Sequence, residues 1–430
     1  MTDTTITKVH GRRVWDSRGR PTVEVEVHVA GGAVGRAIAP AGASRGSNEA
    51  VDLRDGGKPF GGMGVAKAVA NVNHEISRLL QGRNALRQAE IDDALIEADG
   101  TPSKSRLGGN AMIATSMAVL HAVAGAHRMP LYAYLAQGHS VRMPMPEIQV
   151  FGGGAHAGRR VDIQDFMIMA LGAHSFSEAT AMTAEVYRAA GELMQEAGKL
   201  QGVADEGGFW PAFDSNEDAL TMLVRAIERA GYRAGEDIGI SLDIAASEFG
   251  AKGRYRLGLD KRELDSDGLC EMLLGWLKRY PIVSVEDPLA EDDAEGMKKF
   301  TDAAGNDVQI IGDDFLVTSA NRVRDAAALG ACNAVLIKPN QAGTITETKA
   351  ALDAGKAAGW GTIVSARSGE TEDVTIVHLA AGWDAGQLKV GSFARSERMA
   401  KWNEALRIEE RLGNLTGFAG RGVLRTHRAP

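Results

Sequence analysis

The sequence predicts an α/β protein with two domains, a smaller N-terminal α+β domain and a larger domain of repeated strand–helix units. Its 430 residues are enough for two or three domains of roughly 150 residues each. The first part of the chain alternates apolar and polar residues and continues with helical stretches. In the second part, short apolar runs alternate with helical patterns in units of roughly 25–45 residues, which indicates a parallel sheet such as that of a (β/α) barrel.

Strand and helix patterns define the N-terminal domain. Valine occupies every second position from 23 to 29, with polar residues between, which indicates a strand with one buried face. A glycine-rich loop follows at 39–46. The stretches 64–80 and 110–127 have the apolar spacing of helices.

Proline residues indicate where the first domain ends. Pro130 and the run 143–146, which contains two more prolines, are typical of a linker. We therefore predict an N-terminal α+β domain at residues 1–138 and a barrel domain at residues 139–430.

The apolar runs of the second part share one feature, since several of them end in charged residues. The carboxyl ends of barrel strands meet in one mouth, where the active sites of this architecture lie. We therefore expect an active site built from these strand-end residues. They are Asp243, Glu286, Asp287, Asp313, Asp314, Lys338, Arg367 and Lys389.

Three carboxylates, Asp243, Glu286 and Asp313, end successive predicted strands. Close together and without a counter-charge, they would repel one another strongly. A hard divalent cation with oxygen ligands removes this repulsion, and Mg²⁺ fits best. The alternative is that acidic residues end the strands for solubility and cap the following helices, but three at matched depth favour a metal site.

Two lysines, Lys338 and Lys389, end later strands of the same predicted sheet. A lysine that faces a metal ion and other cations can have a lowered pKa and act as a general base. A salt bridge to the carboxylates is the alternative for either lysine alone. A base opposite a metal-bound carboxylate substrate is the arrangement that removes the proton α to that carboxylate.

Composition and charge argue against several classes of protein. The net charge of −8 argues against nucleic-acid binding through a basic surface. Two cysteines, Cys270 and Cys332, exclude a disulfide framework, and a cytoplasmic location fits best. The N-terminus lacks the apolar core of a signal peptide, and no apolar stretch approaches about 18 residues, so we expect no membrane span.

Ordered motifs along nearly the whole chain resemble those of the enolase family. They lie at residues 16–19, 21–27, 42–44, 205–208, 243, 245–249, 286–288, 312–314, 340–341, 343–344, 367–373, 395–398 and 407–410. The resemblance implies the enolase fold, a modified (β/α)8 TIM-like barrel with an N-terminal α+β capping domain. It also implies assembly as a homodimer or a higher homo-oligomer.

The resemblance implies two Mg²⁺ sites. Asp243, Glu286 and Asp313 match the ligands of the first ion. Ser44 matches the loop serine that helps to bind a second ion together with the substrate phosphate.

The resemblance also implies roles in binding and catalysis. Lys338 matches the base that takes the C2 proton, and Glu206 matches the acid that assists loss of the C3 hydroxyl. Lys389 matches a lysine that binds the substrate carboxylate. The histidine loop and the phosphate contacts match His156, Arg367 and Ser368.

Several positions depart from the family's pattern. Ala366 stands where enolases have an active-site histidine, and Gly152 stands where they have asparagine. Asp165, a further candidate catalytic residue, replaces a glutamate, so its carboxylate is one methylene shorter. A displacement of about 1 Å can lower a rate on the order of 10²-fold.

Three arginines also depart from the pattern. Arg45 follows the loop serine, and Arg159 and Arg160 follow the histidine loop. Guanidinium groups suit phosphate, phosphonate or carboxylate, so Arg45 and Arg159 are candidates for binding a second anionic substrate. The alternative is that they are solvated surface charges.

These departures favour a diverged enolase with transferase chemistry, similar to carboxyphosphonoenolpyruvate synthase of phosphinothricin-type antibiotic pathways. Such an enzyme would transfer phosphonoformate from a CMP-activated donor to a 2-phosphoglycerate- or enolpyruvate-type acid. One alternative is an ordinary enolase, which interconverts 2-phosphoglycerate and phosphoenolpyruvate. Another is a non-catalytic binding protein with the enolase fold, but retention of the three carboxylates and both lysines argues against it.

Overall fold

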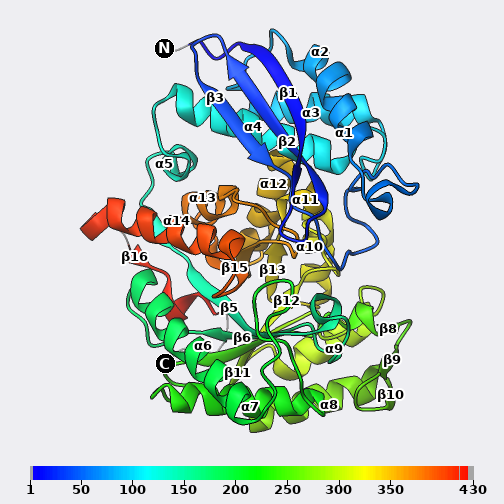
Figure 1. Cartoon of the computed structure of the whole chain (residues 1–430), viewed down its shortest axis with the longest axis vertical. Coiled ribbons are helices and arrows are strands. Elements are labelled where there is room, and N and C mark those ends of the chain that lie inside the picture. Colours follow the sequence, from blue (N-terminus) through cyan, green and yellow to red (C-terminus); the bar gives the residue numbers. More distant parts are fainter. Residues whose placement is uncertain (1–2, 416, 425–430) are drawn as a thin grey trace.

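The computed structural model describes residues 3–415 and 417–424, which form an N-terminal domain joined to an eight-stranded barrel (Figure 1). The N-terminal domain contains an antiparallel sheet of β1 (Ile6–Trp15), β2 (Pro21–Val29) and β3 (Val34–Ile38). Val23, Val25 and Val27 on β2 are fully buried, as their alternation predicts.

The helices of this domain follow the sheet in the sequence. The predicted helical stretch 64–80 contains α1 (Ala66–Asn71), a π-helical turn (Val72–Ile76) and α2 (Ser77–Leu80). The domain continues with α3 (Gln88–Asp99), α4 (Gly109–Ala126) and α5 (Leu131–Ala136).

The core helix of the N-terminal domain is α4, which packs against β2 and β3. It has 18 residues and is apolar enough to cross a membrane by length and composition, so the expectation that no apolar stretch approaches this length was wrong. However, 89% of the stretch is buried inside the protein, as expected for a core helix. Gly35 allows the close packing, because a Cβ there would lie 2.0 Å from the carbonyl oxygen of Ala118.

The second domain is a closed barrel with the strand order β11-β12-β13-β14-β15-β5-β6-β7. Together with the N-terminal domain, this confirms the predicted fold class. The strands are β5 (Met145–Gly152), β6 (Asp165–Met169), β7 (Gly239–Asp243), β11 (Ile282–Glu286), β12 (Gln309–Gly312), β13 (Ala334–Ile337), β14 (Gly361–Ser365) and β15 (Gly386–Ser392).

Helices alternate with most of the barrel strands, as the sequence pattern predicts. They are α6 (Phe176–Glu196), α7 (Asn216–Arg229), α8 (Ser266–Arg279), α9 (Ala294–Ala304), α10 (Ala320–Leu329), α11 (Pro339–Ala342), α12 (Ile345–Ala357), α13 (Thr375–Gly382) and α14 (Ser396–Leu412). Short strands lie outside the barrel, with β4 (Arg142–Met143) paired to β16 (Gly417–Phe418), and β8 (Gly250–Ala251), β9 (Arg254–Leu257) and β10 (Arg262–Asp265) in a small sheet.

One barrel strand, β6, runs in the direction opposite to its neighbours. It pairs antiparallel with both β5 and β7, whereas β15 pairs parallel with β5 and β11 pairs parallel with β7. The beginning of β6 therefore lies beside the carboxyl ends of β5 and β7. Asp165, the first residue of β6, is the register partner of Gly152 and of Asp243. The reversed strand thus places a strand-start residue in the barrel mouth.

A loop of the N-terminal domain reaches the mouth of the barrel. Ala41 and Gly369 exchange two backbone hydrogen bonds of 2.9 Å. Gly369 leaves room for the neighbouring domain, because a Cβ there would lie 2.4 Å from an Nη2 atom of Arg18. The predicted division at residues 138 and 139 lies between α5 and β4 and stays a prediction.

Candidate functional site

The mouth of the barrel contains buried charged side chains from neighbouring strands. Asp243 ends β7, Glu286 ends β11, and the two residues are register partners. The ammonium of Lys389, on β15, lies 3.0 Å from Asp243 Oδ2 and 2.8 Å from Glu286 Oε2. All three side chains are buried, so water screens their interaction little.

A second lysine–carboxylate pair follows β12 and β13. Lys338 Nζ donates to Asp313 Oδ2 at 2.5 Å, and Gln341 Nε2 donates to Asp313 Oδ1 at 2.9 Å. Asp287 accepts the backbone N–H groups of Asp313 at 2.9 Å and of Asp314 at 2.7 Å. Asp287 therefore holds the turn that carries Asp313.

The carboxylates of the mouth fit a divalent cation. Glu286 Oε1 is buried without a hydrogen-bond partner. Burial and the charges of Asp243 and Asp313 raise the pKa of Glu286 well above its usual value. A cation beside these oxygens would offset both the desolvation and the repulsion, and carboxylate oxygens are the ligands that Mg²⁺ prefers.

Carboxylate oxygens also cluster elsewhere in the mouth. Among the described residues, ligand atoms of Asp287, Asp313 and Asp314 all lie within 4.8 Å of one another. The ligand atoms of a second group, His156, Asp165 and Glu206, meet the same limit. Of the three predicted Mg²⁺ ligands, Asp313 belongs to the first group, whereas Asp243 and Glu286 belong to neither. The ammonium of Lys389 lies between the carboxylates of Asp243 and Glu286.

The carboxylates of the mouth raise the pKa values of both lysines. Burial alone lowers the pKa of Lys338, but the charge of Asp313 and other carboxylates outweighs burial and raises it. Burial acts on Lys389 in the same way, but Asp243 and Glu286 raise its pKa well above the usual value. A cation that takes up the charge of these carboxylates would lower both pKa values.

Next to this cluster, a histidine lies between two carboxylates. His156 Nδ1 lies 3.0 Å from Asp165 Oδ1, and its Nε2 lies 3.7 Å from Glu206 Oε1. Burial lowers the pKa of His156, but Glu206 and Asp165 outweigh burial and raise it to about 9. The imidazole is therefore charged at neutral pH. Asp165 Oδ2 lies 3.6 Å from Lys389 Nζ, which connects the histidine group to the mouth carboxylates.

One pocket collects most of the predicted site residues. Its cavity has a volume of about 20 Å³, so the side chains pack closely against one another. Glu286 and Asp313 do not line it, but they contact Lys389 and Lys338, which do. The lining residues are Gly42, Ala43, Ser44, His156, Gln164, Asp165, Glu206, Asp243, Lys338, Ser365, Ala366, Arg367, Ser368, Lys389 and Val390.

Arg367 ties the N-terminal loop to the barrel. Its guanidinium donates to Glu49 Oε2 at 2.9 Å and to the backbone oxygen of Ser44 at 2.9 Å. Both charged side chains of the pair are 5% exposed or less. The ion pair therefore holds the loop that carries Ser44 beside Arg367 and Ser368, which match the phosphate contacts of the family.

The three arginines that depart from the family's pattern do not line this pocket. Arg45 is exposed and Arg160 is half-buried. The side chain of Arg159 is 68% exposed and pairs with Glu248 at 2.8 Å. Their positions therefore do not support the expected role of Arg45 and Arg159 in binding a second anionic substrate.

Sequence reasoning did not single out three residues that hold the site together. Gln164 Nε2 donates to Asp243 Oδ2 at 3.1 Å. Gln164 directly precedes the predicted site residue Asp165, which is a usable signal. Glu49 and Gln149 carry no such signal, because their partners are far away in the sequence.

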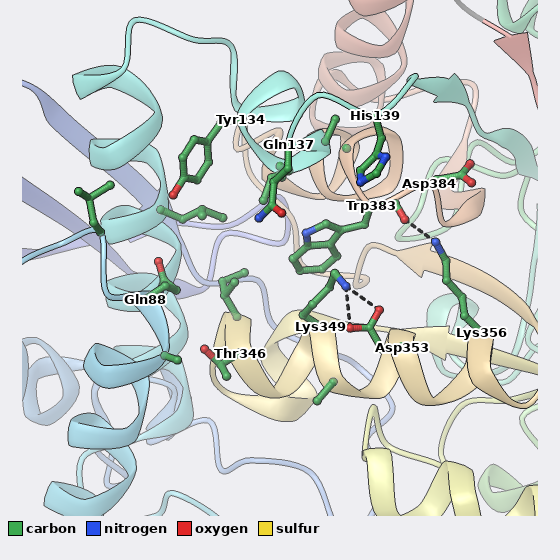
Figure 2. Close-up of a pocket in the computed structure, with 18 of the residues that line it drawn as sticks. Gln88, Tyr134, Gln137, His139, Thr346, Lys349, Asp353, Lys356, Trp383 and Asp384 are labelled. Atoms are coloured by element: carbon green, nitrogen blue, oxygen red, sulfur yellow. Dashed lines mark hydrogen bonds and ion pairs between the residues drawn. The ribbon is translucent and has the colours of Figure 1, made fainter. Parts of the chain in front are cut away.

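A much larger cavity, of about 1050 Å³, lies between the N-terminal domain and the helices α12 and α13 (Figure 2). The charged side chains of α12 that line this cavity interact with other residues that line it. Lys349 pairs with Asp353 at 2.5 Å and 2.6 Å, and Lys356 donates to the carbonyl oxygen of Trp383 at 2.6 Å. None of the carboxylate groups of the mouth lines this cavity, so we place the functional site in the mouth.

Comparisons with known proteins agree with this site. Residues 6–135 match the family described as Enolase, N-terminal domain, and residues 140–427 match Enolase, C-terminal TIM barrel domain. The chain is also 50% identical over 421 residues to Enolase 1 of Desulfitobacterium hafniense (strain Y51). That match covers 97% of this chain and 96% of the relative.

These matches overturn the expected transferase chemistry. The interpretation as an enzyme similar to carboxyphosphonoenolpyruvate synthase was wrong, because half of the residues are identical to Enolase 1 over nearly the full length. The comparison favours the alternative of an ordinary enolase, and nothing supports a CMP-activated donor or a role in antibiotic synthesis. The departures at Ala366 and Asp165 therefore lie within a sequence that matches the enolase family models and Enolase 1 over nearly its full length.

Proposed function

Because the chain belongs to the enolase family, we propose that it catalyses the reversible dehydration of 2-phosphoglycerate to phosphoenolpyruvate. The reaction breaks a C–H bond at C2 and a C–O bond at C3, forms a C=C bond, and releases one water. It is a lyase reaction on a small phosphorylated acid.

Enolase-family enzymes use Mg²⁺, and the mouth of this barrel has carboxylate clusters that can hold it. In our proposal, Asp243, Glu286 and Asp313 hold one ion, and Ser44 helps to hold a second ion with the substrate phosphate. When bound, Mg²⁺ supplies positive charge next to the substrate carboxylate.

The residues of the chain divide the remaining work. Lys338, as a neutral amine, accepts the proton from C2. Glu206 assists departure of the C3 hydroxyl as water. Lys389 binds the substrate carboxylate, and Arg367 with Ser368 binds the phosphate through charge-assisted hydrogen bonds.

One observation carries this proposal. The same buried pocket is lined by the proposed base Lys338, by Lys389, by the proposed acid Glu206 and by Asp243, a predicted Mg²⁺ ligand. A base, an acid and cations in one pocket shielded from water are what elimination next to a carboxylate requires.

The direct test is incubation of the full chain with 2-phosphoglycerate and Mg²⁺, followed by phosphorus NMR. We expect the phosphoenolpyruvate signal to appear, and the Lys338→Ala variant to lack it. A folded, Mg²⁺-binding wild-type protein that leaves 2-phosphoglycerate unchanged would contradict the proposal.

We further propose that the protein works in the cytoplasm as a homodimer or larger homo-oligomer. Cys270 and Cys332 are both free and buried, which suits a reducing compartment. Light scattering coupled to gel filtration measures the mass, and a monomer at micromolar concentration would contradict the assembly.

A further inference from the structure

Gln149, an uncharged residue on β5, connects two of the proposed catalytic groups. Its side chain is fully buried. Its Nε2 donates to Asp165 Oδ1, and its Oε1 accepts the backbone N–H of Gly208 at 2.9 Å. Gly208 lies two residues after Glu206, so a single amide ties the turn that carries Glu206 to Asp165.

The partners of Gln149 determine the orientation of its amide. An ionised carboxylate only accepts hydrogen bonds, and a backbone N–H only donates them, so the amide nitrogen faces Asp165 and the amide oxygen faces Gly208. His156 Nδ1 shares the same Asp165 oxygen at 3.0 Å. The other oxygen, Oδ2, lies 3.6 Å from Lys389 Nζ. Gln149 therefore helps to determine which oxygen of Asp165 faces His156 and which faces the lysine.

Two glycines make room for this amide. A Cβ on Gly208 would lie 2.4 Å from Gln149 Oε1. A Cβ on Gly152 would lie 3.2 Å from Gln149 Oε1 and 2.7 Å from the Cβ of Ala204. Gly152 and Asp165 are both departures from the family's pattern, and they meet at Gln149. The shorter carboxylate of Asp165 accepts a hydrogen bond from the amide of Gln149, and this amide packs against Gly152, which has no side chain.

The turn that carries Glu206 has other anchors besides Gln149. The N–H of Asp205 donates to the carbonyl oxygen of His156 at 3.1 Å, and the N–H of Ser392 donates to the carbonyl oxygen of Glu206 at 2.9 Å. Loss of Gln149 should therefore shift the turn relative to Asp165 without unfolding it. Shifts of about 1 Å at reacting groups can lower a rate about 10²-fold.

We propose that Gln149 is a positioning residue that sets Asp165 and His156 relative to Glu206, and that it acts on loss of the C3 hydroxyl. This proposal rests on the function proposed above. Removal of the C2 proton is assigned to Lys338, whose ammonium is held by Asp313. The rate of this proton removal should therefore depend little on Gln149.

The test compares Gln149→Met with a matched control, Gln309→Met. Gln309 is also fully buried, and its amide bonds to Ser284 at 3.1 Å and to Gln387 at 3.0 Å, at the amino end of β12. Both variants lose the hydrogen bonds of a buried amide but keep a side chain of similar length. Two rates are measured with 2-phosphoglycerate, phosphoenolpyruvate formation and exchange of the C2 proton with deuterated solvent.

We expect Gln149→Met to lower kcat for phosphoenolpyruvate formation about 10²-fold, with KM and C2 exchange changed by less than about threefold. In Gln309→Met, both rates should stay within about threefold of wild type. A proportional fall of both rates in Gln149→Met, or a fall of neither, would overturn the proposal.

A readout independent of catalysis separates this proposal from the proposed function. Amide hydrogen exchange should show faster exchange of the Gly208 N–H in Gln149→Met than in wild type or in Gln309→Met, because its acceptor is lost. Unchanged protection of Gly208 would overturn the contact itself. If the wild-type chain forms no phosphoenolpyruvate, the proposed function is overturned, and with it the role of Gln149 in loss of the hydroxyl. Faster exchange of the Gly208 N–H in Gln149→Met would still support the contact between Gln149 and Gly208.

Discussion

Replacing Glu49 by Gln breaks the buried ion pair that joins the N-terminal loop to the barrel. The side chains of Glu49 and Arg367 are 5% and 3% exposed, and the Oε2–Nη1 and Oε1–Nη2 distances are 2.9 Å and 3.2 Å. Removing one partner of a buried ion pair leaves an uncompensated charge, which typically costs about 3–5 kcal/mol.

The contacts that remain place Glu49→Gln at the lower end of this range. Arg367 still donates to Asn340 Oδ1 at 3.0 Å and to the backbone oxygen of Ser44 at 2.9 Å. Glutamine also keeps an oxygen that can accept the N–H of Gly46, which lies 3.0 Å from Glu49 Oε1. We therefore expect the free energy of unfolding to fall by about 3 kcal/mol.

Urea unfolding followed by circular dichroism measures this change. The matched control is Glu196→Gln, which removes one partner of an ion pair of 3.0 Å with Arg229 at the surface. Because both of these side chains are largely solvated, the control should change the urea midpoint little. Equal midpoints for Glu49→Gln and the control would refute the reasoning that the buried charge of Arg367 depends on Glu49.

Three further outcomes follow from the site. Asp243→Asn should weaken Mg²⁺ binding at least about tenfold in calorimetry. The control, Asp237→Asn, changes a carboxylate that pairs with Arg233 at the surface and should leave Mg²⁺ binding unchanged. Equal effects of the two variants would place the metal site elsewhere. Lys338→Ala should lower C2 deuterium exchange by about 10²–10⁴-fold in proton NMR, and undiminished exchange would assign the base to another group. The pKa of His156 is raised to about 9, so its stabilising contribution is present below its unfolded pKa of about 6.5 and is lost as pH rises towards 9. In EDTA, the wild-type free energy of unfolding should fall over this window by about 3 kcal/mol more than that of His156→Gln, and parallel pH curves would contradict the shift.

The fold class and most of the charged residues that meet in the barrel mouth could be predicted from local sequence patterns. Alternation from 23 to 29 and repeated strand–helix units are local patterns, and local periodicity reports which face of an element is buried. Charged residues at strand ends identified Asp243, Glu286, Asp313 and Lys338 as members of one mouth, because strands of a parallel barrel share a direction. The same local reading overinterpreted Ala366, since a departure from a motif says nothing about the distances around it.

How these groups act on one another depends on strand pairing and on distances that arise when the chain folds. Asp165 enters the mouth because β6 is reversed, a property of strand pairing and not of the residues within β6. Lys338 has a raised pKa because Asp313 lies 2.5 Å away, and Gln149 reaches Gly208 across 59 positions of the chain. Hydrogen bonds and buried charge interactions depend on separations of a few ångströms. The sequence specifies the participating residues, but their separations exist only once the chain has folded.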